Sequence, residues 1–135
     1  MSTTTATTAT TSVHRSGWAQ ARHIGLWAVR VILAAQFVAG GALKLTADPA
    51  MVAMFNDIGA GDWLRLLVGV CEVGGGVGLL APRLVRPAAT GLVLLMAGAA
   101  VTNVVALGTS PAIPLTLLAL AAVVATPPTR KDVAR

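Results

Sequence analysis

Four apolar segments, separated by short polar stretches, dominate the sequence. They run from about Ile24 to Leu43, Trp63 to Leu80, Pro87 to Leu107 and Pro111 to Ala125. A helix of about 20 apolar residues spans the ~30 Å hydrocarbon core of a bilayer. The first three segments have this length. The fourth is at the lower limit and requires extended ends or a locally thinner bilayer. The pattern predicts an all-α fold, an integral membrane four-helix bundle.

The composition supports a lipid environment and argues against nucleic acid as a partner. Of the 135 residues, 56% are hydrophobic and 11% are charged, whereas a soluble domain carries ~25% charged residues. The net charge of +5 could attract nucleic acid. However, the charges lie between the apolar segments, and the chain has no Tyr, two Phe and three Trp. It therefore lacks the aromatic platform on which bases stack.

The two ends of the chain flank one membrane domain. Residues 1–12 are almost entirely Thr, Ala and Ser, a composition that buries nothing and predicts disorder. We therefore expect a disordered tail and basic junction over 1–23, a membrane domain over 24–126 and a short basic tail over 127–135. A cleaved signal peptide is the alternative for the first segment. It is disfavoured because the apolar run exceeds the ~7–15-residue apolar core of such peptides.

A short amphipathic helix is predicted between the first two spans. Asp48 followed by Pro49 is typical of an N-cap and first helical position, and Gly59 can close the helix. Its apolar residues recur at i, i+3, i+4 and i+7, namely Met51, Met54, Phe55 and Ile58. This spacing indicates a helix that lies at the extracytoplasmic interface of the membrane. A loop with incidental apolar residues is the alternative.

The charges between the spans predict their orientation. Positive charges precede the first span, separate the second from the third and follow the fourth, whereas the loop over 44–62 has a net charge of −2. The positive-inside rule then places both termini in the cytoplasm. Trp63 begins the second span at the outer headgroup level. The charges that set this topology are Arg15 and Arg22 before the first span, Arg83 and Arg86 after the second, and Arg130, Lys131 and Arg135 in the tail. Arg30, Arg83, Arg86 and Trp63 are the residues that we assign to topology and to the membrane interface.

Few ionisable residues lie within the predicted spans, and each is costly in lipid. Arg30 lies about two turns inside the first span, where its side chain can snorkel toward the cytoplasm. Glu72 lies near the middle of the second span and needs a partner, a proton or water. Because side chains lean toward the N-terminus of their helix, Glu72 leans outward and Lys44 leans inward. Neighbouring antiparallel spans would therefore bring Lys44 and Glu72 together, as a functional site or as a structural ion pair.

Other polar residues fall in the outer half of the bundle. Arg65 lies seven residues before Glu72 on nearly the same helix face. It is either a second ion-pair partner for Glu72 or a charge that neutralises the outer mouth of the bundle. Gln36 lies at a depth close to that of Glu72, and Asn103 lies somewhat nearer the surface. We expect Lys44, Glu72, Arg65, Asn103 and Gln36 to line one polar pocket. The alternative is that polar residues of this kind, with Thr102 and Thr116, join helices by hydrogen bonds.

The remaining sequence features favour packing over catalysis. Gly74 and Gly78 have GxxxG spacing, which favours close helix approach within the chain or self-association. Cys71 is the only cysteine, so it forms no intramolecular disulfide and is expected to be a small buried residue. No catalytic or metal-binding signature is present. We therefore assign no catalytic residue and no metal site.

Three stretches resemble the DoxX-like family of small bacterial membrane proteins. They are AGGALKL at 39–45, DPAMVAMF at 48–55 and LVGVCEVGGGVGLLAPRL at 67–84. The likeness covers roughly residues 25–126, and its most specific elements are Gly41, Lys44 and Glu72. The family is similar in having four spans and an outer helix after the first. Its members often carry His in the third span, where this chain has Asn103, so a proton-transfer or metal role there is not implied.

The resemblance implies a multi-pass protein of the bacterial plasma membrane. Relatives are linked to quinol oxidase, thiosulfate:quinone oxidoreduction and thiol-redox complexes. Our leading hypothesis is a non-catalytic accessory or assembly subunit of a membrane redox complex. A second is a binder or transporter of a quinone, a lipid or an anion, and a third is a quinone-handling oxidoreductase subunit. The expected partners are the lipid bilayer, other membrane or redox proteins and a second copy of the chain. No tightly held cofactor is expected beyond a bound quinone or lipid.

Overall fold

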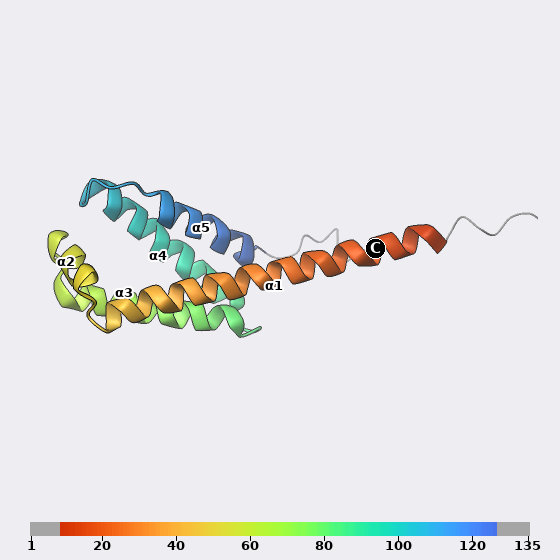
Figure 1. Cartoon of the computed structure of the whole chain (residues 1–135), viewed down its shortest axis with the longest axis horizontal. Coiled ribbons are helices and arrows are strands. Elements are labelled where there is room, and N and C mark those ends of the chain that lie inside the picture. The colour runs from red at the N-terminus through yellow and green to blue at the C-terminus, as the bar shows by residue number, and fades with distance from the viewer. Residues whose placement is uncertain (1–8, 127–135) are drawn as a thin grey trace, which may run out of the picture.

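Five helices make up the part of the chain that the structure describes, residues 9–126, and no strand occurs within that range. The structure is a computed structural model (Figure 1). The helices are α1 (Ala9–Leu45), α2 (Pro49–Asp57), α3 (Gly61–Leu80), α4 (Val85–Val105) and α5 (Ala112–Ala125).

Four of the helices form a ring. Around the ring, α1 packs against α3, α3 packs against α4, α4 packs against α5, and α5 packs against α1. The contact between α1 and α3 is the most extensive. The backbones of the diagonal pairs α1 and α4, and α3 and α5, do not approach each other closely. The α1/α3 pair and the α4/α5 hairpin meet at one end of the bundle and diverge toward the other, where α2 lies against α3 (Figure 1). This divergence leaves the α2 end less tightly packed.

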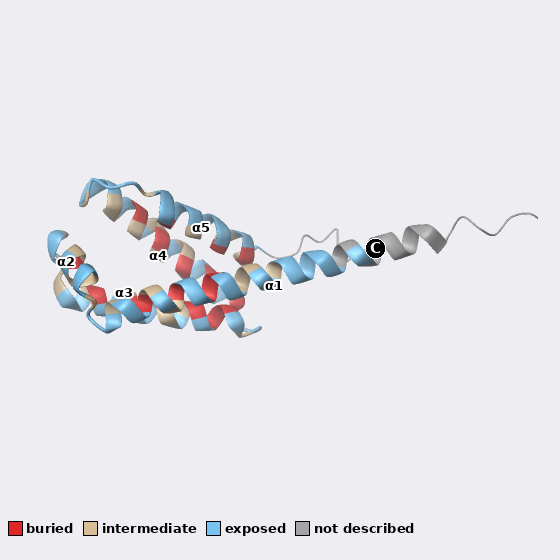
Figure 2. Ribbon diagram, in the orientation of Figure 1, coloured by how far each residue is buried: buried red, intermediate tan, exposed pale blue. Residues whose placement is uncertain are grey.

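The helices have the character of membrane spans. Within the described residues, Gln20–Leu45, Gly61–Leu80 and Val85–Val105 are long and apolar enough to cross a bilayer. Large apolar side chains are exposed along the outer faces (Figure 2), and such surface requires lipid around it. The prediction of an all-α membrane helical bundle is confirmed. α5 has 14 residues, or about 21 Å at the helical rise, so it is shorter than the ~30 Å hydrocarbon core.

The first helix begins earlier than the sequence indicated. α1 starts at Ala9, so residues 9–12 are helical where disorder was expected, and residues 1–8 lie outside the described residues. Extending an existing helix costs much less than nucleating one, and the stretch Ala19–Arg22 consists of good helix formers. The helix of the first span therefore continues through the basic junction. The predicted tail over 127–135 also lies outside the described residues.

The short helix between the first two spans is confirmed, and the loop alternative is wrong. The Asp48 side chain accepts a hydrogen bond from the backbone N–H of Ala50, and Pro49 begins the helix. Gly59 follows the helix with φ of 71°, a left-handed conformation that glycine adopts without steric cost. Phe55 is buried and its apolar neighbours on the same face are half-buried. The apolar face of α2 therefore covers the end of the bundle.

The hydrophobic core occupies only one half of the bundle. It contains Leu33 and Phe37 of α1, Leu79 of α3, Leu92 of α4 and Val124 of α5. All are at most 5% exposed. These residues lie toward the end where the helix pairs converge, as the buried positions in Figure 2 show. The half nearer α2 lacks a comparable layer of large buried side chains in the described residues.

Glycines allow α1 and α3 to approach backbone to backbone. A Cβ added at Gly41 would lie 2.7 Å from the Gly69 carbonyl oxygen and 2.7 Å from a Val73 methyl carbon. A Cβ at Gly76 would lie 3.0 Å from the Ala34 carbonyl oxygen. Lipid tails give helices no net hydrophobic reason to associate, so such close contact is a main source of attraction.

The GxxxG pair is used unequally, and the expectation for Cys71 is wrong. Gly78 packs against α4, where an added Cβ would lie 2.8 Å from Ala88 Cβ, but nothing lies within 4 Å of the corresponding position at Gly74. Cys71 is exposed and lines a shallow outer groove between α3 and α4 together with Gly74 and Gly91. Cys71 and Gly74 lie on a different face of α3 from Gly69 and Gly76, which contact α1.

Replacing Gly41 by alanine tests the close contact. The new methyl group would overlap backbone and side-chain atoms of α3, so we expect the free energy of unfolding to fall by about 1–3 kcal/mol. Gly74→Ala is the matched control on α3. It should leave stability unchanged or raise it by ~0.5–1 kcal/mol because alanine favours the helix. Denaturation in mild detergent measures both, and equal effects would contradict the contact.

Candidate functional site

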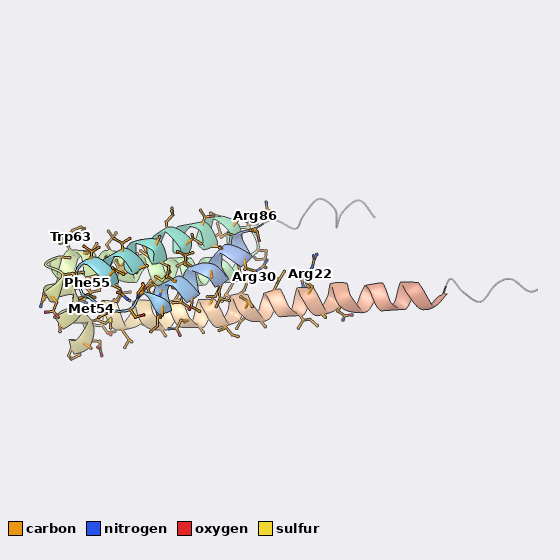
Figure 3. The ribbon with its side chains drawn as sticks, turned by 90° about the horizontal axis from the view of Figure 1, so that it is seen from above. Arg22, Arg30, Met54, Phe55, Trp63 and Arg86 are labelled. Atoms are coloured by element: carbon orange, nitrogen blue, oxygen red, sulfur yellow. The ribbon has the colours of Figure 1, made fainter. Side chains whose placement is uncertain are left out.

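A pocket of about 350 Å³ lies beneath α2. It is bounded by α2 and by the facing sides of α3 and α4, with Lys44 of α1 at its edge. Most of the lining is apolar, and its polar members are Lys44, Glu72, Thr102 and Asn103. Figure 3 shows Met54, Phe55 and Trp63 at this end of the molecule, opposite to Arg30 and Arg86. The apolar side chains of the lining include Met54, Phe55, Ile58, Leu64, Val68, Leu95 and Ala99.

Lys44 and Glu72 form an ion pair at this pocket. Lys44 Nζ donates to Glu72 Oε2 at 2.8 Å, and the two side chains are 13% and 8% exposed. Lys44 Nζ also lies 3.4 Å from the carbonyl oxygen of Gly40. The sequence predicted this contact, because the Lys44 side chain was expected to point inward and the Glu72 side chain outward. The pair has no net charge, which lowers the cost of holding both groups inside a bundle.

The glycine contacts between α1 and α3 determine where this ion pair forms. Gly41 faces Gly69 and Val73, so Lys44 and Glu72 lie on either side of the closest approach of the two helices. Gly40 adds to this placement, because a Cβ there would lie 3.5 Å from Glu72 Oε2. A larger residue at position 40 would occupy the space beside the carboxylate, and one at position 41 would push the two helices apart. The small residues before Lys44 are therefore part of the site.

Arg65 does not pair with Glu72, and it does not line the pocket. It is 5% exposed and donates to Asp62 Oδ1 from Nε at 3.2 Å and from Nη2 at 2.9 Å. Its Nη1 donates to the carbonyl oxygen of Lys44. Carbonyls in the last turn of a helix lack partners within the helix, so Arg65 satisfies the end of α1. It holds the backbone of Lys44 in place while the Lys44 side chain reaches Glu72.

Asn103 lines the mouth of the pocket and also orders the loop between α4 and α5. Its Nδ2 donates to the Ser110 carbonyl at 3.2 Å, and its own carbonyl accepts from the Thr109 backbone N–H at 2.8 Å. Leu92 lies beside Gly75, and in antiparallel helices this register puts Asn103 level with Leu64. That level is about 12 Å from Glu72 along α3 at the helical rise. Asn103 and Glu72 therefore mark opposite ends of an elongated pocket.

The structure separates Gln36 from the other expected pocket residues. Gln36 is exposed and lines a groove between α1 and α5 together with Thr116. The expectation of one shared pocket is therefore wrong for Gln36. The hydroxyls of Thr102 and Thr116 donate to carbonyls of their own helices four residues earlier, so they do not bond between helices as the alternative predicted. Depth alone could not show which way each side chain faces around its helix.

The residues used to predict the topology and the membrane interface differ in exposure and lie toward opposite ends of the bundle (Figure 3). Arg30 is half-buried on α1, and Arg83 and Arg86 are exposed in the α3–α4 turn and the first turn of α4. Trp63 is 67% exposed at the α2 end. Figure 3 shows Arg22, Arg30 and Arg86 toward one end of the molecule and Trp63 at the other. The two ends therefore differ in charge, whichever side of the membrane each one faces.

Several pocket residues were not identified from the sequence. Met54, Phe55 and Ile58 were predicted only as the apolar face of the short interfacial helix, and the structure shows that they form the roof of the pocket. Leu64 and Val68 precede Glu72 at intervals of four residues, and this spacing, which puts residues on one helix face, could have indicated them. The contribution of α4 had no comparable signal, because nearly all of its residues are apolar.

The arrangement has the form of a small-molecule binding site. No group of three His, Cys, Asp or Glu side chains in residues 9–126 could hold a metal ion. An apolar pocket with a few fixed polar groups is the usual form of a small-molecule site, and such pockets measure ~300–1,000 Å³. The site can therefore enclose an apolar body while presenting one ion pair to a polar group.

Comparison with known proteins identifies one family. The model of the DoxX-like family matches residues 28–126, a range that contains the whole pocket and excludes the N-terminal part of α1. No curated protein matches the chain, and no solved structure matches it.

Breaking the ion pair should destabilise the bundle. Lys44→Met leaves Glu72 without its partner, and we expect the free energy of unfolding to fall by about 2–3 kcal/mol. This is below the ~3–5 kcal/mol typical of a fully buried pair because both groups are partly exposed. The double variant Lys44→Met/Glu72→Leu should be more stable than Lys44→Met alone.

Gln36→Leu is the matched control, because it removes a polar group from α1 outside the pair. It should change the free energy of unfolding by less than ~0.5 kcal/mol. Denaturation in mild detergent is measured for this control and for the double-mutant cycle, which consists of the original protein, Lys44→Met, Glu72→Leu and the double variant. Simple additivity of the two single effects would contradict an energetically coupled pair.

Proposed function

The chain belongs to the DoxX-like family, and we propose that this member is a non-enzymatic membrane protein that binds a small, largely apolar molecule with a neutral polar group. The observation that carries the proposal is the pocket beneath α2. It has apolar walls on three helices and a single compensated ion pair at its inner end. An isolated structural ion pair would not need an open volume of about 350 Å³ beside it.

The charge state of the site favours a neutral ligand over an anion. Lys44 already contacts Glu72 at 2.8 Å, so an anion would have to displace the carboxylate and leave it unpaired. Removing the partner of a buried charge is costly. The other oxygen of Glu72 has no hydrogen-bond partner in residues 9–126 and can accept from a ligand hydroxyl. The Lys44 ammonium has three N–H donors and uses two of them within the protein, for Glu72 and for the Gly40 carbonyl. The third can donate to a ligand carbonyl.

The shape of the pocket indicates how a ligand reaches it. α2 packs on α3 and α1 but makes no backbone contact with α4 in the described structure. The side of the pocket between α2 and α4 is therefore bounded by side chains alone. A molecule dissolved in the adjacent leaflet can pass between these two helices with its apolar part still in lipid. Lipids and quinones have the required combination of an apolar body and a hydroxyl or carbonyl head.

Participation in a larger membrane assembly is the second candidate function. The groove lined by Cys71, Gly74 and Gly91 runs along the outside of α3 and α4, and small residues at a lipid-facing surface favour close helix association. An accessory or assembly subunit of a redox complex would use this surface and could present a bound ligand to its partner. A second copy of the chain could occupy the same surface. Recovery of a defined partner after mild cross-linking would favour this function.

Filling the pocket tests the proposed binding function. Val68→Trp places a large ring inside the pocket without altering the ion pair, and Val70→Trp places the same ring on the exposed side of the same helix. We expect Val68→Trp to weaken binding at least about tenfold, since the ring occupies the space of the ligand. Val70→Trp should bind like the original protein.

Binding is measured with the purified full chain in mild detergent. The probes are a short-chain quinone, a long-chain alcohol and a fatty acid that is ionised at the pH of the assay. Mass spectrometry also identifies molecules that copurify. Neutral probes should bind more tightly than the fatty acid. Equal binding to the two tryptophan variants, or preference for the fatty acid, would overturn the proposal.

We propose that the α2 end faces the extracytoplasmic side of the bacterial plasma membrane, with both termini in the cytoplasm. The positive charges around the bundle support this orientation. In a Cys71→Ala background, a membrane-impermeant maleimide added to intact cells should label Asp57→Cys on α2. It should leave Arg86→Cys unlabelled until the membrane is permeabilised. The reverse labelling pattern would show the opposite orientation.

A further inference from the structure

The end of the bundle opposite the pocket carries positive charge that the described chain does not neutralise. Arg30, Arg83 and Arg86 make no ion pair with any residue in the range 9–126. The acidic side chains in that range all lie in the half of the bundle nearer α2. They are Asp48, Asp57, Asp62 and Glu72.

Arg30 differs from an ordinary surface arginine. It is half-buried, and its Nε is enclosed without any hydrogen-bond partner among the described residues. A guanidinium has no acceptor and is always charged, so an enclosed N–H of this group needs an oxygen atom from somewhere. Buried polar groups without a partner are rare, and such a group often indicates a bound molecule or ion.

The register of α1 and α3 places Arg30 beside the turn that carries the other two arginines. Ala34 faces Gly76. Arg30 lies one turn before Ala34 on α1, and Leu80 lies one turn after Gly76 on α3. Because the two helices are antiparallel, Arg30 is therefore level with Leu80. Arg83 and Arg86 follow at once in the α3–α4 turn and the first turn of α4. Figure 3 shows Arg30 and Arg86 at this same end of the bundle. Glu72 lies about 12 Å away along α3 at the helical rise, beyond the reach of a direct ion pair.

We propose that Arg30, with Arg83 and Arg86, binds an anionic phosphate group at this end of the bundle, supplied by the headgroup of an acidic phospholipid. Arginine suits this ligand because its planar fork of N–H donors matches phosphate oxygens. Basic residues between helices at a membrane surface are typical of sites for acidic lipid headgroups. The apolar side chains exposed on the neighbouring faces of α1 and α3, such as Trp27 and Leu80, would contact the acyl chains.

The site is distinct from a general attraction of positive charge to an acidic membrane. Diffuse attraction depends on the number of charges, whereas a site depends on which arginine is removed. Arg22 provides the comparison, because it lies on the same helix two turns before Arg30 and is fully outside the bundle (Figure 3). Arg22→Gln and Arg30→Gln remove the same charge from α1 at different positions.

Lipid titration of the delipidated full chain in neutral detergent tests the proposal. Phosphatidylglycerol, phosphatidylcholine and inorganic phosphate are added separately, and thermal unfolding and native mass spectrometry report binding. We expect one phosphatidylglycerol per chain, bound at least about tenfold more tightly than phosphatidylcholine. Arg30→Gln should lower that affinity about tenfold, as expected when a charge-assisted pair is lost, and Arg22→Gln should change it less than about twofold.

Each result has a defined meaning. Equal losses in the Arg22 and Arg30 variants, or no preference for phosphatidylglycerol, would overturn the site. Protection by inorganic phosphate equal to that by phosphatidylglycerol would support the phosphate chemistry with a soluble source in place of a lipid. If Arg30→Gln does not fold, Arg30→Lys and Arg86→Gln replace it. Both should bind phosphatidylglycerol more weakly than the original protein, and unchanged binding in both would overturn the proposal.

Discussion

The close approach of α1 and α3 is the contact on which the rest of the structure depends. Gly41 and Gly69 let the two backbones touch, and this spacing brings Lys44 within hydrogen-bond distance of Glu72. Arg65 then fixes the end of α1 by bonding to the Lys44 carbonyl. The backbone contact, the ion pair and the capped helix end support one another, because each holds the same turn of α1 against α3. In lipid, where burial of apolar surface contributes little, such contacts determine how helices associate.

The bundle divides into a packed half and an open half. Where the helix pairs converge, Leu33, Phe37 and Leu79 interlock with residues of α4 and α5. Where the pairs diverge, α2 covers the space and the pocket replaces the core. The packed half gives the molecule a fixed frame, and the open half can accept a ligand without disturbing that frame. The proposed binding site and the hydrophobic core thus occupy different layers of the same helices.

The sequence predicted the elements well and the side-chain directions poorly. Length and hydropathy identified the spans, Asp48 and Pro49 identified the start of α2, and the leans of Lys44 and Glu72 anticipated their contact. Depth along a helix can be counted from residue numbers. The direction around the helix depends on which faces pack, so Gln36 and Cys71 were misplaced although their depths were sound. Arg65 was misassigned although Asp62, three residues earlier on the same helix, could have indicated one of its acceptors. Its other acceptor, the Lys44 carbonyl, leaves no mark in the residue pattern.

The ion pair has a consequence for the electrical behaviour of the protein. A lone carboxylate or ammonium at this depth would feel part of the membrane potential, which is worth ~2.3 kcal/mol per unit charge for each 100 mV across the full membrane. Lys44 and Glu72 lie 2.8 Å apart and their charges cancel, so the field does almost no net work on them as a unit. A neutral molecule that binds beside the pair moves no charge either. If the pocket binds such a neutral molecule, as we propose, the membrane potential should have almost no direct effect on the affinity of the site.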